Sequence, residues 1–247
     1  MKVSRGQDRQ GGETVEITFR SWRISVEYTP RTDAELAAMY DEAAERWHER
    51  VQLLGYTRAY GGLFARLEGE GLLDPLRGGG RVLDCGIGTG TFVLALIRRV
   101  AAPVRIDGVD VSPTMLDQAD LNLERAGAEY YLHRCDIRKM PFGDGTIDAV
   151  LGAHVLEHLP DPLAGLSEMA RVLKPGGPLV VITTRRGVLS ALVRLRCRYS
   201  LTREEQLVRW MEEVGLRDVG AYPLTAGGPL PRRVSVARVG FKKGALR

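Results

Sequence analysis

The chain has 247 residues, of which 44% are hydrophobic and 27% charged, an ordinary composition for a globular protein with one large core. Its three cysteines include no C-x-x-C pair, so neither a disulfide framework nor a zinc knuckle is indicated. The sequence shows no apolar signal-peptide segment and no uncharged run of membrane-spanning length, and we therefore expect a cytoplasmic protein.

The net charge of +4 is unevenly distributed along the chain. From Thr184 to Arg247 there are 14 Lys and Arg residues against 5 Asp and Glu residues, and the remainder of the chain is acidic. A basic C-terminal quarter fits contact with phosphate, a membrane surface or an acidic substrate. A solvated surface that maintains solubility explains the same charge equally well.

The N-terminal part divides into three segments. Residues 1–13 are polar and expected to be disordered. Residues 15–19 and 22–28 alternate apolar and polar side chains in opposite parity, which predicts two strands or one bulged strand. Residues 29–56 then follow a helical pattern, because Leu36, Met39, Ala43 and Trp47 fall on one helix face.

From about residue 80 onward, short apolar segments alternate with helical ones. This alternation predicts an α/β fold with a doubly wound, Rossmann-like and mostly parallel sheet, helices on both faces and an antiparallel strand near the C-terminus. Ligands of such sheets bind at the carboxyl ends of the strands, where the strand order reverses. The functional residues should therefore lie at the strand ends.

A glycine-rich turn follows the first strand of this region, in the segment VLDCGIGTG. Asp84, Gly86, Gly88 and Gly90 complete an acid-x-G-x-G-x-G pattern, whose glycines let a ligand lie against backbone N–H groups. The G-x-G-x-x-G pattern of a nicotinamide dinucleotide site would need glycine at position 91, which is Thr91. A dehydrogenase is therefore disfavoured.

Two more acids occur at predicted strand ends. Asp110 follows the second strand, where a carboxylate can accept both ribose hydroxyls of a nucleoside. Asp136 is expected to close the third strand, and its carboxylate can accept the hydrogens of an exocyclic amine such as that of adenine. One acid alone is better explained as a helix cap or a solvated loop residue.

In these segments the chain resembles the class I S-adenosylmethionine-dependent methyltransferases, particularly the small-molecule group that includes quinone-biosynthesis enzymes. The resemblance runs from about Arg81 to Leu216. Its motifs are VLDCGIGTG, GVDVSPTML, CDIRKMPFGDGTIDAV, HVLEHLPDP and EMARVLKPGGPLVVIT.

The resemblance implies S-adenosyl-L-methionine as cofactor and S-adenosyl-L-homocysteine as product. It also implies that the turn with Asp84, Gly86, Gly88 and Gly90 cradles the methionine part and that Asp110 holds the ribose. Asp136, Ile137 and Met115 would lie near adenine, and Tyr40, in YDEAAERW, would fold over the cofactor.

The segment HVLEH, residues 154–158, also matches the His-x-x-Glu-His pattern of a zinc protease family. A zinc site would need both histidines on one helix, but Pro160 disfavours helix at Leu159 and the preceding residues read as a strand. We therefore expect no metal. In the methyltransferase interpretation His154 ends the fourth strand beside the methyl group and is the candidate general base, although a pocket-lining histidine is an equal alternative.

The acceptor should contact the parts outside the common core. We expect a tail at 1–13, a strand and helical cover of the active site at 14–79, and a catalytic core at 80–247 with a substrate-covering insertion near 185–200. That insertion combines an apolar stripe with Arg194, Arg196 and Arg198, which suits a small hydrophobic acceptor. Contact with a lipid or membrane surface is an alternative, as is a water-facing amphipathic cover.

The expected reaction is in-line transfer of a methyl group to this small molecule, with no nucleic-acid partner, by a monomer or homodimer. The rival functions are a nucleic-acid or lipid methyltransferase that uses the basic C-terminal region, and a non-catalytic S-adenosylmethionine-binding regulator.

Overall fold

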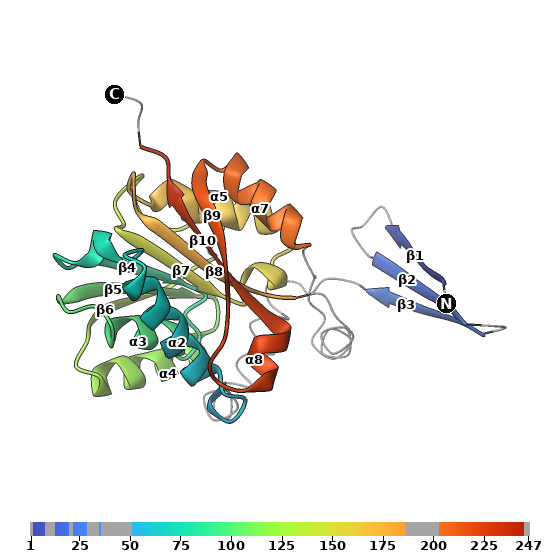
Figure 1. Ribbon diagram of the computed structural model, residues 1–247, viewed down its shortest axis with the longest axis horizontal. Coiled ribbons are helices and arrows are strands. Elements are labelled where there is room, and N and C mark those ends of the chain that lie inside the picture. Colours follow the sequence, from blue (N-terminus) through green and yellow to red (C-terminus); the bar gives the residue numbers. More distant parts are fainter. Residues whose placement is uncertain are drawn as a thin grey trace.

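The structure is a computed structural model that describes residues 2–7, 13–19, 22–28, 35, 51–185 and 203–244. Within these residues the chain forms a three-stranded sheet and a seven-stranded sheet (Figure 1). Most of the predicted helix at 29–56, the residue Tyr40 and the insertion near 185–200 lie outside the described residues, apart from Arg185.

The three-stranded sheet consists of β1 (Lys2–Gln7), β2 (Glu13–Phe19) and β3 (Trp22–Tyr28), paired antiparallel in that order. The two strands predicted from alternating residues are β2 and β3. The expectation of disorder at 1–13 is corrected at β1, because Lys2–Gln7 pairs with β2 from Lys2–Thr18 to Gln7–Glu13. A polar segment can form a strand when it satisfies the backbone groups of a neighbouring strand edge.

The seven-stranded sheet has the order β6-β5-β4-β7-β8-β10-β9. Its strands are β4 (Gly80–Cys85), β5 (Val104–Asp110), β6 (Glu129–Arg134), β7 (Ala149–Ala153), β8 (Pro178–Thr184), β9 (Leu216–Pro223) and β10 (Ser235–Lys242). The first five strands pair in parallel, and β10 pairs antiparallel with both β8 and β9. The predicted sheet, including its antiparallel C-terminal strand, is confirmed.

The described helices cover both faces of this sheet (Figure 1). They are α2 (Tyr56–Gly69), α3 (Thr91–Ile97), α4 (Pro113–Arg125), α5 (Pro162–Val172), α7 (Glu204–Glu213) and α8 (Pro229–Val234), with the 3₁₀ turns η1 (Asp74–Leu76) and η2 (Leu156–His158). No helix among these described elements is long and apolar enough to cross a membrane.

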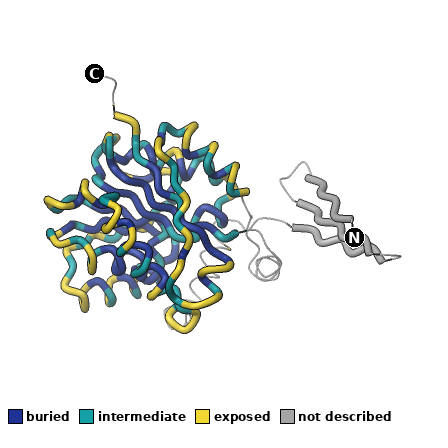
Figure 2. The backbone as a smooth tube through the Cα atoms, in the orientation of Figure 1, coloured by how far each residue is buried: buried dark blue, intermediate teal, exposed yellow. Residues whose placement is uncertain are grey.

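Two hydrophobic clusters hold the layers together, one on each face of the sheet. Successive strand residues alternate between them: Val82 and Val180 join α2, α3 and α4, whereas Leu83 and Val181 join α5 and α7. This alternation follows from the period of two in a strand, and the central strands are buried on both faces (Figure 2). The buried sheet is therefore a rigid support for the loops at its strand ends.

Candidate active site

The strand order reverses beside β4. The chain proceeds outward from β4 through β5 to β6 on one side, then returns to β7 and β8 on the other. Because these strands are parallel, the loops after β4, β5 and β7 lie at the same edge of the sheet. This is the position at which open α/β sheets bind their ligands.

The glycine turn after β4 adopts backbone angles that favour glycine. Gly86, Gly88 and Gly90 have φ values of 67°, 52° and 78°. A Cβ at Gly88 would meet no atom within 4 Å, whereas one at Gly86 would lie 2.5 Å from Cγ2 of Val155. The turn thus packs closely against the loop after β7 at Gly86 and leaves open space at Gly88.

Asp110, at the end of β5, is connected directly to this turn. Its Oδ2 accepts a hydrogen bond from the backbone N–H of Gly88 at 2.9 Å, and its Oδ1 accepts one from Ser112 at 3.0 Å. Ser112 in turn caps α4 by accepting from the N–H of Met115. Asp110 therefore fixes the turn as well as offering a carboxylate at its rim.

Asp84 is buried at the end of β4, with 1% of its surface exposed. No described group makes a hydrogen bond of ordinary geometry with either of its carboxylate oxygens. Burial raises the pKa of Asp84 to about 7, although the backbone of Val93 acts to lower it and the charge of Asp110 adds to the rise. A buried carboxylate of this kind is suited to pairing with a cationic group of a ligand.

Asp136 departs from its expected position. β6 ends at Arg134, so Asp136 lies in the following loop and does not close the strand. Its carboxylate accepts hydrogen bonds from the backbone N–H and the guanidinium of Arg138, at 2.8 Å from both the backbone nitrogen and Nε. This local pairing of an Asp side chain with the backbone two residues on competes with continuation of the strand.

The other two residues assigned to the adenine end are buried. Ile137 follows Asp136 and is 3% exposed, and Met115 in the first turn of α4 is 1% exposed. Tyr40 lies outside the described residues.

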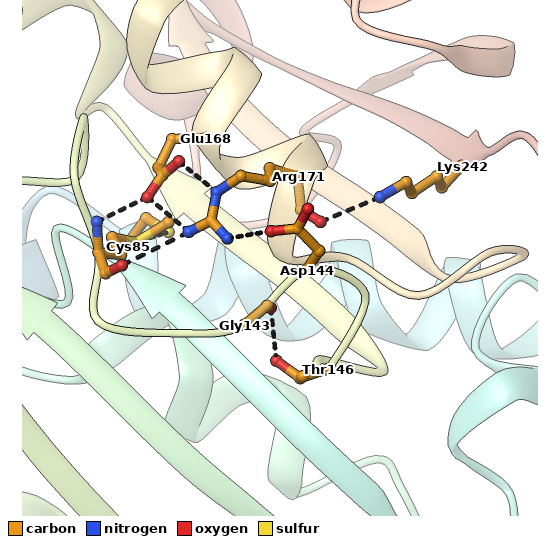
Figure 3. Close-up of polar contacts among 8 residues, drawn as sticks. Cys85, Gly143, Asp144, Thr146, Glu168, Arg171 and Lys242 are labelled. Atoms are coloured by element: carbon orange, nitrogen blue, oxygen red, sulfur yellow. Dashed lines mark hydrogen bonds and ion pairs between the residues drawn. The ribbon is translucent and has the colours of Figure 1, made fainter.

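Asp136 and Ile137 belong to the loop between β6 and β7, whose later part is held by Arg171 of α5. Figure 3 shows the contacts of Arg171 with Glu168 and Asp144. The Nε of Arg171 donates to Glu168 at 2.6 Å, and Glu168 accepts a further bond from the N–H of Met140 at 2.7 Å. Arg171 also pairs with Asp144 at 2.5 Å and donates to the carbonyl of Met140. These bonds hold the pKa of Glu168 below its ordinary value.

The segment HVLEH leaves β7 and forms one 3₁₀ turn, Leu156–His158. His154 has a φ of 56°, an unusual backbone conformation for a residue other than glycine, and its N–H donates to the carbonyl of Ile182 at 2.8 Å. The two histidines are therefore not presented by one α-helix, as the zinc interpretation requires. Within the described part of the chain, no three His, Cys, Asp or Glu residues form a metal-ligand group.

His154 is held by hydrogen bonds at both ring nitrogens. Nδ1 lies 3.0 Å from Oε1 of Glu157, and Nε2 lies 3.3 Å from Oγ of Ser235. The Ser235 hydroxyl lies 2.9 Å from that of Tyr56, whose ring contacts the His154 ring edge-on at a centroid distance of 5.5 Å. Thr184 donates to Glu157 from its backbone N–H and from its hydroxyl. His154, Glu157, Thr184, Ser235 and Tyr56 are called the His154 group below.

Burial would raise the pKa of Glu157, but the hydrogen bond and charge of His154, the charge of His158 and the hydrogen bond from Thr184 hold it below its ordinary value. Burial also raises the pKa of Tyr56, against the lowering effect of the Ser235 bond. At neutral pH the group therefore contains a carboxylate and an intact phenol.

Sequence reasoning identified His154 but assigned no role to Tyr56, Glu157 or Ser235. Glu157 lies in the HVLEH motif three residues after His154, and this spacing could have predicted that the two side chains meet across one turn. Tyr56 and Ser235 are 179 residues apart, and only the antiparallel placement of β10 beside β8 brings them together.

Comparison with known proteins defines the class of this protein. The model of a family described as "Methyltransferase domain" matches residues 82–177. A phosphatidylethanolamine N-methyltransferase of Cereibacter sphaeroides is 33% identical over 150 residues, which cover 59% of this chain and 70% of that protein. A demethylmenaquinone methyltransferase of Bacillus licheniformis is 30% identical over 192 residues, covering 67% of this chain and 80% of that protein.

Two further relatives, both named as ubiquinone/menaquinone biosynthesis C-methyltransferases, are matched over 65% and 62% of their own lengths. Among solved structures, a geranyl diphosphate C-methyltransferase of Streptomyces coelicolor in complex with S-adenosyl-L-homocysteine aligns with a TM-score of 0.58. That alignment covers 72% of this chain and 80% of the other at 19% identity, and supports the fold.

The chain belongs to the class I S-adenosylmethionine-dependent methyltransferases, and it resembles their quinone-biosynthesis group. The described residues fit the cofactor. The open space at Gly88 admits a ligand against the turn, and the buried, unsatisfied carboxylate of Asp84 suits a cation.

Proposed function

We propose that this methyltransferase acts on a small hydrophobic acceptor with an acidic hydroxyl, of the type of a reduced demethylmenaquinone. The named quinone-biosynthesis relatives support this class of acceptor. The observation that carries the proposal is the His154 group, which supplies a proton acceptor at the end of β7, next to the glycine turn. Removal of a hydroxyl proton makes the ring of a hydroquinone a stronger nucleophile.

In this proposal the turn from Gly86 to Gly90 lies against the methionine part of the cofactor, and Asp84 faces its cationic groups. Asp110 accepts the ribose hydroxyls. Asp136, Ile137 and Met115 contact adenine, with Arg138 moving aside or sharing the Asp136 carboxylate, and Tyr40 covers the cofactor. The bound cofactor supplies a methyl group on a positively charged sulfur, so the protein's part is alignment, exclusion of water and removal of the acceptor's proton.

The division into an N-terminal cover at 14–79 and a core at 80–247, with acceptor contacts from the insertion near 185–200, is part of the same proposal, as is a cytoplasmic location. One contact of α2 supports the assignment of residues 14–79 to a cover of the active site. Tyr56, at the start of α2, lies edge-on against the His154 ring.

A labelled-methyl assay tests the acceptor class. The protein is incubated with S-adenosylmethionine carrying a labelled methyl group and either reduced demethylmenaquinone in detergent or phosphatidylethanolamine vesicles, and products are identified by mass. We expect label in the quinol and its loss in His154→Ala, with cofactor affinity retained. Label in the lipid alone would favour an N-methyltransferase like the Cereibacter sphaeroides relative, and an undiminished rate in His154→Ala would exclude this residue as the base.

A further inference from the structure

The hydrogen bonds around His154 have a definite direction. Glu157 is 4% exposed and ionised, so it accepts a hydrogen bond and the Nδ1 of neutral His154 must carry the donated proton. Nε2 is then an acceptor, and the Ser235 hydroxyl donates to it. Because a hydroxyl has one hydrogen, Ser235 accepts from the hydroxyl of Tyr56.

This direction limits how His154 can act. Both of its ring nitrogens are engaged, Nδ1 by Glu157 and by the Thr184 hydroxyl at 3.3 Å, and Nε2 by Ser235, which is fully buried. An acceptor could reach Nε2 only by displacing Ser235. Tyr56, at the first residue of α2, is only partly buried, and its oxygen ends the chain of hydrogen bonds on the side away from His154.

Resting on the proposed function, we propose that Tyr56 and Ser235 form a proton relay that connects the acceptor to His154. The acceptor hydroxyl gives its proton to the Tyr56 oxygen, Tyr56 gives its own proton to Ser235, and Ser235 gives its proton to Nε2 of His154. The electron pair released on the acceptor oxygen is delocalised into the ring, whose carbon forms the bond to the methyl carbon while the carbon–sulfur bond breaks and its pair stays on sulfur. The methylated ring carbon then loses its hydrogen as a proton and the acceptor oxygen regains one, which restores the aromatic quinol and leaves one proton on His154.

The resulting imidazolium lies beside the Glu157 carboxylate, which offsets its charge. Tyr56 is thus the group expected to touch the acceptor, and Glu157 is a positioning residue that sets the His154 tautomer. The left-handed backbone at His154 is consistent with a side chain whose orientation is imposed by these contacts.

The first test needs no acceptor. Nitrogen NMR of the His154 ring, assigned by comparison with His154→Ala and recorded where the ring is neutral, reports which nitrogen carries the proton. We expect the Nδ1–H tautomer in the wild type, a mixture of tautomers in Glu157→Gln, and a shifted Nε2 resonance in Ser235→Ala. An Nε2–H tautomer in the wild type, or an Nε2 resonance unchanged by Ser235→Ala, would overturn the relay whatever the acceptor is.

The second test uses reduced demethylmenaquinone as the probe. Tyr56→Phe and Ser235→Ala should lower kcat about 100-fold, the lower end of the range for positioned acid–base catalysis, without changing cofactor affinity. A proton inventory in mixed light and heavy water should be curved for the wild type and linear for both variants. Tyr131→Phe and Ser167→Ala, at exposed positions on β6 and α5, are the matched controls.

The two tests separate the two proposals. A wild type that gives no labelled quinol contradicts the proposed acceptor, and the NMR result then still decides the His154 arrangement. An active wild type with undiminished kcat in Tyr56→Phe contradicts the relay and leaves the proposed function standing.

Discussion

Val155 packs against Gly86, so that the loop leaving β7 and the turn leaving β4 are in direct contact. A Cβ at position 86 would come within 2.5 Å of Val155 Cγ2, which is closer than real side chains approach. Since Val155 follows His154 in the chain, this contact ties the position of the candidate base to that of the candidate cofactor turn.

Alanine substitutions at Gly86 and Gly88 distinguish the contribution of the Val155 contact to stability from the contribution of the turn to cofactor binding. Gly86→Ala should lose about 1–2 kcal/mol of unfolding free energy from its left-handed backbone and about 1–3 kcal/mol more from overpacking against Val155. Gly88→Ala meets no neighbour within 4 Å, so it should lose only the backbone contribution while its methyl group blocks the cofactor. Urea unfolding and calorimetric titration with S-adenosylmethionine measure both effects, and equal destabilisation by the two substitutions would show that the Val155 contact is unimportant.

Removal of the Asp110 side chain should weaken cofactor binding. Asp110→Ala deletes a carboxylate proposed to hold the ribose and also its bonds to Gly88 and Ser112. We expect a loss of about 1.5–3 kcal/mol in binding free energy, as for hydrogen bonds to charged groups. Ser112→Ala is the control, because it removes the hydroxyl that caps α4 and leaves the carboxylate in place. An Asp110→Ala affinity equal to that of the wild type would refute the ribose assignment.

The raised pKa of Asp84 predicts two effects of pH. A carboxyl group whose pKa rises from its ordinary 3.8 to about 7 on folding favours the folded state when protonated. The stability of the wild type relative to Asp84→Asn should therefore fall by up to about 4 kcal/mol as pH rises from 4 through 7. Chemical unfolding at several pH values measures this difference, and a pH-independent difference would contradict it.

The same carboxyl group should link cofactor binding to pH. A cation bound beside Asp84 favours the ionised carboxylate, so S-adenosylmethionine should bind more tightly at pH 8 than at pH 6. Where the carboxyl of the free protein is still protonated, binding should release that proton. Titration calorimetry in buffers of different ionisation enthalpy measures the released proton. Asp84→Asn should abolish the release, and its persistence in that variant would assign the proton to another group.

Arg171 should stabilise the loop that carries Asp136 and Ile137. Arg171→Lys keeps the charge but cannot make the forked contacts with Glu168 and Asp144, and it should cost about 1.5–3 kcal/mol. Hydrogen exchange should accelerate at residues 140–146. Asp144→Asn is the control, since Asp144 is 82% exposed and its ion pair should contribute less than about 1 kcal/mol. Unchanged exchange in Arg171→Lys would show that the loop is held by other contacts.

The sequence predicted the parts of this molecule that depend on local pattern. The parallel strands and the glycine turn follow from apolar runs and from residues that tolerate positive φ, and both are present in the structure. Strand ends were less predictable, because the Asp136 side chain bonds to the Arg138 backbone and β6 stops at Arg134. The Tyr56–Ser235 contact depends on tertiary structure and no local pattern signals it.

A crystal structure of the protein soaked with S-adenosyl-L-homocysteine tests the central claim most directly. We predict density for the nucleoside along the turn from Gly86 to Gly90, with its ribose hydroxyls within hydrogen-bond distance of the Asp110 carboxylate and its base beside Ile137. Density for the nucleoside at any other edge of the sheet, with this crevice empty, would contradict the account.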